Sequence, residues 1–428
     1  MLDYILIWIS INIIILIHEY GHFSVARLNN IRVEIFSVGL GKAIWSYQMG
    51  ETTIQLGWIP LGGYVQLYSN THDTSESNYL NAYWYQKVCI LLAGPMINLF
   101  AGILCLWLAL SIGIMQVKPI IGEVIPESPA ATAGLEPNEL ITYIDGKSVD
   151  SWTDVMVSII RAWGDQTSLS ISTDHGGQHR LNISNIQDQG NMLSNLGLSV
   201  VGYNTIIKNI APLSPAESGG LQLGDQIIKI NQKPVEYWED LQQHIQQYPN
   251  ETVDITILRD ETTINRSILL SEKYRRGYLG IEPEMKSVDI STLKFGGIDA
   301  ISESIERSFQ YLSINWVILQ KLITGSMSLD ALTGPIGLFS ITKTALNTGT
   351  GEFFYLLAMI NLALFFFNLL PIPGLDGSLI LLTSIESILS RKYFSLELQA
   401  LLIRIGMVGL LVLAFQISIN DVLKIYQQ

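Results

Sequence analysis

The residues best suited to catalysis in this 428-residue chain lie near its start, in the sequence His18-Glu19-Tyr20-Gly21-His22. In a helix, positions i and i+4 lie on one face, so the two imidazoles can bind a single zinc ion. Glu19 lies beside them and can take a proton from a water on the zinc and pass it to a leaving amine. The motif therefore indicates metal-assisted hydrolysis of a peptide bond.

The surroundings of this motif strengthen that interpretation. It lies at the end of an apolar segment from Leu2 to about Phe23, which lacks the basic start and the cleavage site of a signal peptide. We therefore expect a retained membrane helix. Burying two imidazoles and a carboxylate there costs on the order of several kcal/mol, and ionisable groups in such helices are usually functional. The structural alternative is that they pair with polar partners in a helix bundle.

A hydrolytic zinc site needs three protein ligands and one open position. A second polar stretch lies in a later apolar segment, where prolines and glycines interrupt the helix between Asn368 and Gly377. Irregular backbone at membrane depth is tolerated where it is buried in protein or lines a wet cavity. Asp376 is the only carboxylate of this stretch, so we predict that it is the third ligand. The alternative is a carboxylate that caps a helix.

Two asparagines could complete such a site. Asn368 could bind the substrate backbone or orient a tetrahedral oxyanion, or it could make an interhelical hydrogen bond. Asn98 follows Gly94 and Pro95 in another apolar segment, and it could lie near the site or serve helix packing. Both alternatives stay open for each residue.

Composition indicates a membrane protein, because 48% of the residues are hydrophobic and only 15% are charged. Crossing a bilayer takes roughly 20 apolar residues. The net charge of −13 argues against a nucleic-acid partner. Four segments are long enough to span: Leu2 to Phe23, Val88 to Met115, Phe353 to Leu370, and Leu401 to Ile419.

Basic residues near these segments predict the orientation of the chain. Lys and Arg gather in the 24–87 loop and at Arg391 and Lys392 in the 384–400 loop. Since basic loops stay in the cytoplasm, both termini and the central polar block are expected on the opposite side.

The central block contains an internal repeat at an offset of 86 residues. Ser128-Pro129-Ala130 recurs as Ser214-Pro215-Ala216, and Trp152 recurs as Trp238 without a gap. Two homologous modules of mixed strands and helices are expected. Glycines and alternating residues in the 28–87 loop predict β-hairpins, and apolar spacing over 300–323 predicts a helix on the membrane surface or on the third span. The expected divisions are 1–27, 28–87, 88–115, 116–201, 202–288, 289–350, 351–383, 384–400 and 401–420.

Taken together, these motifs resemble the site-2 protease family (M50), and within it the bacterial branch of the sigma-E stress response. The resemblance covers almost the whole chain and rests on the His-Glu-x-Gly-His motif, on residues 60–65, on Gly94-Pro95-x-x-Asn98, and on the 368–377 pattern. It implies a polytopic α-helical membrane protein with four transmembrane helices, a membrane-embedded β-hairpin and two α+β PDZ-like domains. It also implies one zinc ion held by His18, His22 and Asp376, with Glu19 as the base.

The resemblance extends to the binding of substrates. It implies that an unwound substrate adds as a strand to the hairpin edge at about Ile44 to Leu56, near Gly39 and Gly41, unless the hairpin merely packs against the helices. The modules resemble circularly permuted PDZ domains, in which backbone N–H groups capture a peptide carboxylate. The corresponding loops contain Leu196, Gly197, Tyr278, Leu279 and Gly280.

The first module departs from the PDZ pattern, because Asn138-Glu139 stands where the second module has Gly224-Asp225. Peptide binding by the first module is therefore in doubt. The family resemblance implies that the tandem modules act as a size filter in the periplasm. It implies single-span membrane substrates in the bacterial inner membrane, namely an anti-sigma factor already trimmed by a site-1 protease, and signal-peptide remnants.

Two other classes of function compete with a protease. A non-hydrolytic membrane scaffold would carry the PDZ-like modules above a vestigial site, but the intact Glu19 argues against it. A metal transporter could use His18, His22 and Asp376 as an ion site, but it would need an inverted repeat among the spans. No such repeat is found in the sequence.

Overall fold

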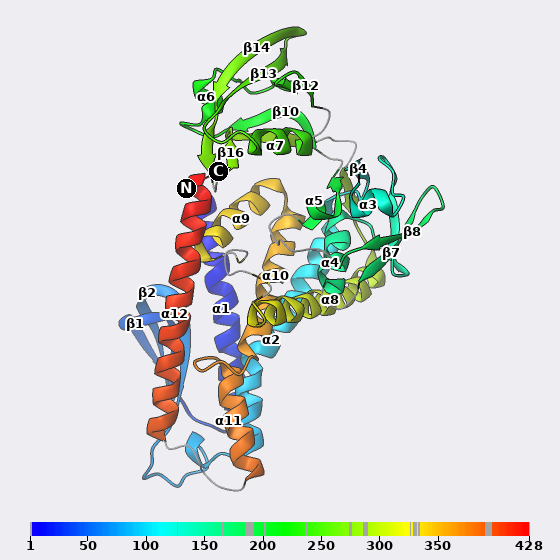
Figure 1. Cartoon of the computed structure of the whole chain (residues 1–428). Helices are drawn as coiled ribbons and strands as arrows, with labels where there is room; N and C mark the ends of the chain where they lie inside the picture. The colour runs from blue at the N-terminus through cyan, green and yellow to red at the C-terminus, as the bar shows by residue number, and fades with distance from the viewer. Residues whose placement is uncertain are drawn as a thin grey trace. The chain divides into compact units, whose positions relative to one another are not determined.

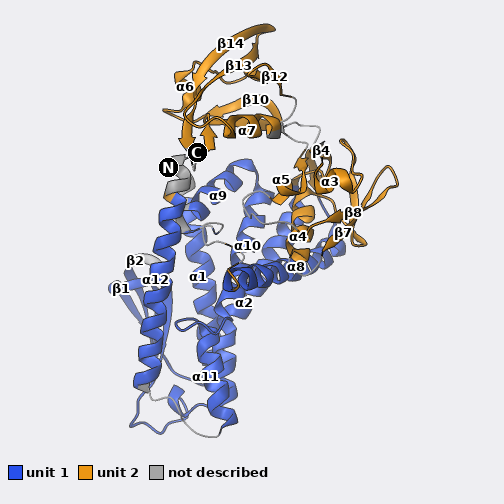
Figure 2. Ribbon diagram, viewed as in Figure 1, with its two compact units in different colours: residues 1–114, 294–323, 332–421 blue, residues 115–293, 324–331, 422–428 orange. Residues whose placement is uncertain are grey.

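The computed structural model describes residues 2–125, 127–163, 167–184, 192–200, 203–235, 238–273, 276–285, 290–325, 327, 332, 334–389 and 396–427. Residues 390–395 of the predicted 384–400 loop, with Arg391 and Lys392, lie outside this description. The chain divides into two compact units (Figure 2). Unit 1 holds residues 1–114, 294–323 and 332–421, and unit 2 holds residues 115–293, 324–331 and 422–428.

Unit 1 is built mainly from long apolar helices (Figure 1). Among the described residues, four helices are long and apolar enough to cross a membrane, over Leu6–Leu28, Trp84–Ile112, Thr350–Asn368 and Glu397–Val422. The helices of this unit are α1 (Leu2–Leu28), α2 (Trp84–Ile112), α8 (Gly297–Ile323), α9 (Pro335–Thr348), α10 (Thr350–Asn368), α11 (Asp376–Ile388) and α12 (Leu396–Gln427), with a 3-10 helix at Tyr79–Asn81.

Helix α2 contacts α1, α10 and α11, so it is the central packing element of this unit. Gly102 lets α10 approach closely, since a Cβ there would lie 2.9 Å from the Leu362 side chain. Helix α2 ends at Ile112, before the predicted Met115, because Gly113 adopts a φ of 108° and Ile114–Val117 forms strand β3. The predicted break of the third apolar segment is present, because residues 369–375 separate α10 from α11.

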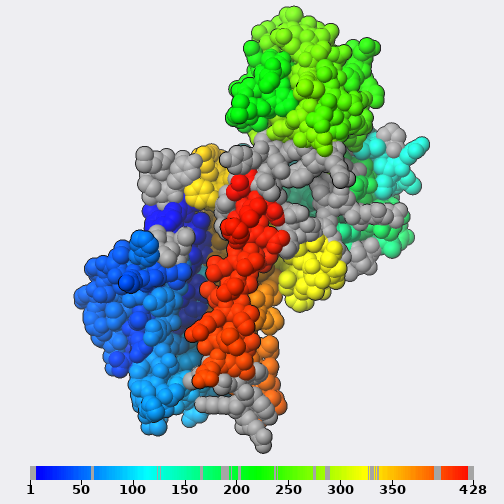
Figure 3. Space-filling model, turned by 60° about the vertical axis from the view of Figure 1, so that its left-hand side comes forward, coloured from blue at the N-terminus to red at the C-terminus, as the bar shows by residue number. Residues whose placement is uncertain are grey.

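Helix α12 has little protein cover over its apolar part. Only 6% of its most apolar window is buried, and Figure 3 shows its side chains in red along an open face of unit 1. Ile405, Leu411 and Phe415 are exposed by 60%, 65% and 69%. An apolar helix with so little contact needs another apolar medium, which a bilayer provides.

Helix α8 corresponds to the predicted helix at 300–323, but the face that packs against protein differs from the apolar stripe. Helix α8 contacts α2 and α10, and its buried residues are the small Ala300, Ser304 and Ser308, whereas Phe309 and Trp316 are exposed by 59% and 51%. Small side chains let helix backbones approach closely, which explains why they form the packed face. The predicted 289–350 linker also contains a second helix, α9.

The glycine-rich loop forms strands β1 (Val33–Met49) and β2 (Thr52–Leu67), and each strand contributes two paired segments. Residues 33–38 pair with 63–67 on one side, and 35–38 of the same strand pair with 53–56 on the other, while 45–49 pair with 52–56. Gly39 and Gly41 have φ values of 87° and 85°, which lets β1 turn between its two halves. The predicted edge at Ile44 to Leu56 is therefore only partly right. Residues 45–49 lie at an edge, but 53–56 are paired on both sides.

Unit 2 contains the two repeated modules. The first comprises β4 (Ile121–Val124), α3 (Pro129–Thr132), β5 (Ile141–Ile144), β6 (Lys147–Ser148), α4 (Trp152–Ala162), β7 (Ser168–Thr173), β8 (Gln178–Asn182), α5 (Met192–Leu196) and β9 (Leu198–Val200). Its sheets run β6-β5-β7-β8 and β4-β9, around a core of buried apolar residues that includes Trp152.

The second module comprises β10 (Tyr203–Ile210), α6 (Pro215–Ser218), β11 (Gln226–Ile230), β12 (Lys233–Pro234), α7 (Trp238–Gln246), β13 (Thr252–Arg259), β14 (Thr262–Leu269), β15 (Ser271–Lys273), β16 (Arg276–Tyr278) and β17 (Ile281–Met285). Its main sheet runs β14-β13-β11-β10-β17, with β12 on β11, and β15 pairs with β16. Strand β18 (Ile290–Leu293) follows and pairs with β3.

The repeat is visible in local structure. Ser128 and Ser214 cap α3 and α6 by accepting hydrogen bonds from Ala131 N and Glu217 N. In the second module, buried Asp225 forms two short ion-pair contacts with Arg259, at 2.6 and 2.7 Å, and this hydrogen bonding raises the pKa of Arg259. In the first module, Glu139 takes the place of Asp225.

Candidate metal centre

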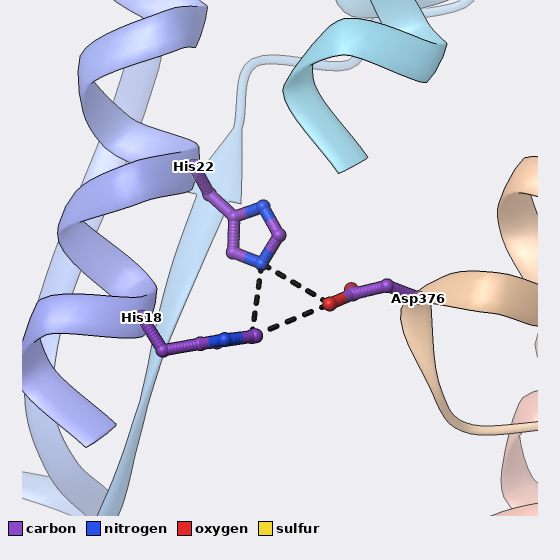
Figure 4. A group of neighbouring side chains, drawn as sticks. All are labelled: His18, His22 and Asp376. Carbon is purple, nitrogen blue, oxygen red and sulfur yellow. Dashed lines mark hydrogen bonds and ion pairs between the residues drawn. The ribbon is translucent and has the colours of Figure 1, made fainter. Parts of the chain in front are cut away.

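Three side chains from two helices converge in unit 1 (Figure 4). His18 and His22 lie one turn apart on α1, with 3.2 Å between their Nε2 atoms. Asp376 is the first residue of α11, and its Oδ2 lies 3.3 Å from the Nε2 of His18 and 3.4 Å from that of His22. In the described part of the chain, these three form a group of His, Cys, Asp and Glu residues whose ligand atoms all lie within 4.8 Å of one another.

The spacing of these atoms fits a zinc ion. In a tetrahedral site with ligand distances of about 2.0–2.1 Å, neighbouring donor atoms lie roughly 3.3–3.4 Å apart. The three separations here are 3.2, 3.3 and 3.4 Å. The Oδ2 of Asp376 is also buried without a hydrogen-bond partner, although it lies near both imidazoles. A buried carboxylate oxygen in that position suits coordination to a cation.

Helix α2 brings the two imidazoles into a confined space. A Cβ on Gly21 would lie 2.8 Å from the backbone carbon of Ala93, so this glycine allows α1 and α2 to pack closely. Gly94 lies against the imidazoles, where a Cβ would be 2.6 Å from the Cε1 of His22 and 2.8 Å from the Cε1 of His18. The Gly94 position is therefore part of the site, a role that the sequence motif did not reveal.

The loop before α11 holds Asp376 in place. Pro371 and Pro373 interrupt the helix, because proline lacks a backbone donor and restricts the residue before it. Gly374 adopts a φ of 98°, and Ser378 donates from its hydroxyl to the carbonyl of Leu375 at 2.7 Å. Gly406 of α12 packs against Pro373 without room for a side chain. The helix break thus directs the carboxylate toward α1.

Glu19 is held by the hairpin. The backbone N–H of Val65 in β2 hydrogen-bonds to the Glu19 carboxylate. Gly63 lies beside it, where a Cβ would be 3.1 Å from the Cγ of Glu19 and 2.8 Å from the carbonyl oxygen of Ser37. Sequence reasoning did not assign Gly63 and Val65 to the site. The only signal was their place in the 60–65 motif.

Asn98 is the predicted asparagine whose contact with a proposed ligand is resolved. Its side chain is fully buried, with the Nδ2 atom 3.3 Å from the Nδ1 of His18. Asn368 is half-buried and is the last residue of α10. Gly39 and Gly41 shape β1 through their positive φ angles.

The predicted carboxylate loops belong to unit 2. Gly197 and Gly280 have φ values of 76° and 84°, and each packs closely against the serine that caps the neighbouring short helix. Leu196 and Leu279 are buried in the cores of their modules, and Tyr278 ends β16. The two loops therefore have matching local structures.

Comparisons with known proteins agree with this geometry. The model of peptidase family M50 matches residues 6–413. The regulator of sigma-E protease RseP of Escherichia coli K12 is 30% identical over 439 residues, covering 96% of both chains. The regulator of sigma E protease of Haemophilus influenzae is 30% identical over 97% of this chain and 98% of its own. A Vibrio cholerae protein named as a zinc metalloprotease is 31% identical over 91% of both.

Among solved structures, a PDZ domain from Listeria monocytogenes aligns with 20% of this chain and 90% of its own, at 19% identity and a TM-score of 0.18.

Proposed function

This chain belongs to peptidase family M50 and is a metalloprotease, and from that premise we propose that it is an intramembrane zinc protease of single-span membrane proteins. The observation that carries the proposal is the convergence of His18, His22 and Asp376 within a unit of apolar helices. Proteolysis at that site would take place at the depth of the bilayer.

The proposed arrangement in the membrane follows the basic loops and the helices. We place four spans in the bacterial inner membrane, with the 24–87 and 384–400 loops in the cytoplasm. Both termini and the two PDZ-like modules then lie in the periplasm. The β1–β2 hairpin is embedded at the membrane, which is supported by the exposure of Ile44, Trp45 and Trp58 by 66%, 56% and 68%.

The residues of the site have distinct proposed roles. A zinc ion held by His18, His22 and Asp376 would supply Lewis acidity that polarises a peptide carbonyl and lowers the pKa of a water. Glu19 takes a proton from the attacking water and delivers it to the leaving amine nitrogen. The hydrogen bond from Val65 N fixes the direction of its carboxylate. Asn368 is assigned to the substrate backbone or the developing oxyanion.

A substrate helix has to unwind before its peptide bonds can reach this site. Strand addition to a sheet edge would hold the unwound segment by backbone hydrogen bonds. Among the described residues, segments 45–49 and 63–67 each pair with one neighbouring strand segment, so each lies at an edge of the sheet. Segment 63–67 lies beside Glu19, so we assign the scissile region to this edge and the more distant part of the substrate to 45–49.

The proposed substrates are an anti-sigma factor already trimmed by a site-1 protease, and signal-peptide remnants. The relatives named as regulators of sigma-E protease support the first assignment. The tandem modules are proposed to exclude substrates with intact periplasmic domains, and the loop at Tyr278–Gly280 of the second module is proposed to bind a C-terminal peptide carboxylate. The first module, with Asn138-Glu139 in place of Gly224-Asp225, is not assigned this binding.

The test is a cleavage assay with purified full-length protein in detergent and a single-span anti-sigma factor fragment. We expect cleavage by the wild type, none after removal of zinc by a chelator, and recovery when zinc is restored. Glu19→Gln should abolish cleavage. Cleavage that persists in Glu19→Gln would contradict the proposed chemistry, and absence of cleavage by the wild type would favour a membrane scaffold.

A further inference from the structure

We infer that Asn98 is a positioning residue, whose amide oxygen accepts a hydrogen bond from Nδ1–H of His18 and thereby leaves the Nε2 of His18 free to bind zinc. This inference rests on the proposed zinc site and deepens it. It gives Asn98 a specific role, where the sequence left open a place near the site or a part in helix packing.

The contact is buried and specific. Asn98 lies on α2 with 0% exposure, and its Nδ2 atom is 3.3 Å from the Nδ1 of His18. Its Oδ1 atom is buried without a hydrogen-bond partner. The side chain is therefore closed to solvent. It contacts the ring of a proposed ligand.

The protonation state of a zinc-binding imidazole decides which amide atom belongs next to it. A neutral imidazole carries one N–H, and a nitrogen that binds zinc carries none. If Nε2 of His18 faces the ion, the proton is on Nδ1, and it needs an acceptor. The amide NH2 group cannot accept, but the amide oxygen can. The two amide orientations have nearly the same shape, and the hydrogen-bond network decides between them.

The Nδ1–H of His22 also needs an acceptor, and a backbone carbonyl provides it. This Nδ1 lies 2.8 Å from the carbonyl oxygen of Ile90, also on α2. That carbonyl accepts the Nδ1–H, which leaves the Nε2 of His22 pointing toward Asp376. Helix α2 therefore orients both rings, one through a backbone oxygen and one through the Asn98 side chain. Outer partners of this kind fix the ring orientation and raise the basicity of the ligand.

The experiment measures zinc affinity of the full-length protein in detergent, by competition with a chromophoric chelator. Asn98→Leu removes the acceptor at similar size and should weaken zinc binding by about 10- to 100-fold. Asn98→Asp restores an acceptor and should return the affinity to within about threefold of the wild type, since carboxylates commonly fill this role. Asn361→Leu is the matched control, because Asn361 is also buried in a span but donates to the carbonyl of Leu357. It should bind zinc as the wild type does.

A second readout uses the absorption spectrum of the Co²⁺-loaded proteins, which reports the ligand field. We expect Asn98→Asp to keep a tetrahedral spectrum. The inference is overturned if Asn98→Leu binds zinc as tightly as the wild type, or if Asn98→Asp is as weak as Asn98→Leu. Should Asn98→Leu not fold, the Asn98→Asp affinity alone decides. A wild type that binds no zinc would instead overturn the proposed function itself.

Discussion

Gly94 of α2 lies directly against the imidazole of His22, with no room between them for a side chain. A Cβ at this position would fall 2.6 Å from the Cε1 of His22, closer than real Cβ atoms come to other heavy atoms. The backbone of α2 at Gly94 therefore limits how far the two imidazole rings can rotate. The site depends on the absence of a methyl group as much as on its three proposed ligands.

Gly94→Ala should therefore impair zinc binding while the spans stay folded. The new methyl group would also lie 2.8 Å from the Cε1 of His18, so both rings must move. We expect at least a tenfold loss of zinc affinity, of the order seen when the partners of metal ligands are disturbed. Zinc content after dialysis measures it. Gly409→Ala, a helical glycine with open space around it, is the control and should retain zinc. Full zinc retention by Gly94→Ala would contradict the packing described here.

Gly63→Ala should reduce catalysis without removing zinc. The added methyl group would press on the Cγ of Glu19 and on the carbonyl of Ser37, and so displace the proposed base from its hydrogen bond with Val65. A displacement of about 1 Å can cost roughly 100-fold in rate. The measurement compares kcat and zinc content of Gly63→Ala with those of Gly296→Ala, a glycine without close neighbours. An unchanged kcat would show that Gly63 does not position Glu19.

Asp421→Ala should loosen the start of α9. The buried Asp421 carboxylate accepts hydrogen bonds from Gly334 N at 3.1 Å and Gly337 N at 2.8 Å, so it caps α9 and ties it to α12. Loss of such a cap costs about 1–2 kcal/mol. Hydrogen exchange over residues 337–348 should speed up in the full-length protein. Glu397→Ala, an exposed acid on the same helix, should leave exchange unchanged. Equal protection in both variants would count against the cap.

Asp225→Ala should destabilise the second module. Asp225 is 1% exposed and forms an ion pair with Arg259. Its carboxylate also accepts a hydrogen bond from Gln222 N at 2.8 Å. Removing the carboxylate leaves the N–H of Gln222 and the guanidinium of Arg259 without this partner. Faster hydrogen exchange across β11 and β13 in the full-length protein measures the effect, with exposed Glu251→Ala as the control. Exchange at the wild-type rate would mean that the pair contributes little.

The sequence was sufficient to predict that the three proposed ligands converge, because each is an ionisable residue in or next to an apolar segment. Ionisable residues are expensive in apolar segments, so His18, His22 and Asp376 could be selected without knowing the fold. The helix break before Asp376 followed from Pro371 and Pro373. The internal repeat could also be recognised, because the sequences of the two modules align without gaps.

Other features depend on tertiary packing, which one sequence does not reveal. The hairpin folds back on itself at Gly39 and Gly41, so residues 53–56, which the family resemblance placed at an edge, are paired on both sides. The sequence left open whether the apolar stripe of α8 lies on the membrane surface or packs on the third span; Phe309 is exposed, and the buried residues are small ones such as Ser304. The hydrogen bond of Val65 to Glu19 joins residues distant in sequence.

The zinc content of the purified full-length enzyme tests the central claim most directly. We predict one zinc per chain in the wild type and in Glu19→Gln, and loss of zinc in Asp376→Ala at chelator concentrations that the wild type withstands. If Asp376→Ala keeps one zinc per chain with the affinity of the wild type, the carboxylate is not a ligand and the proposed metal centre is wrong.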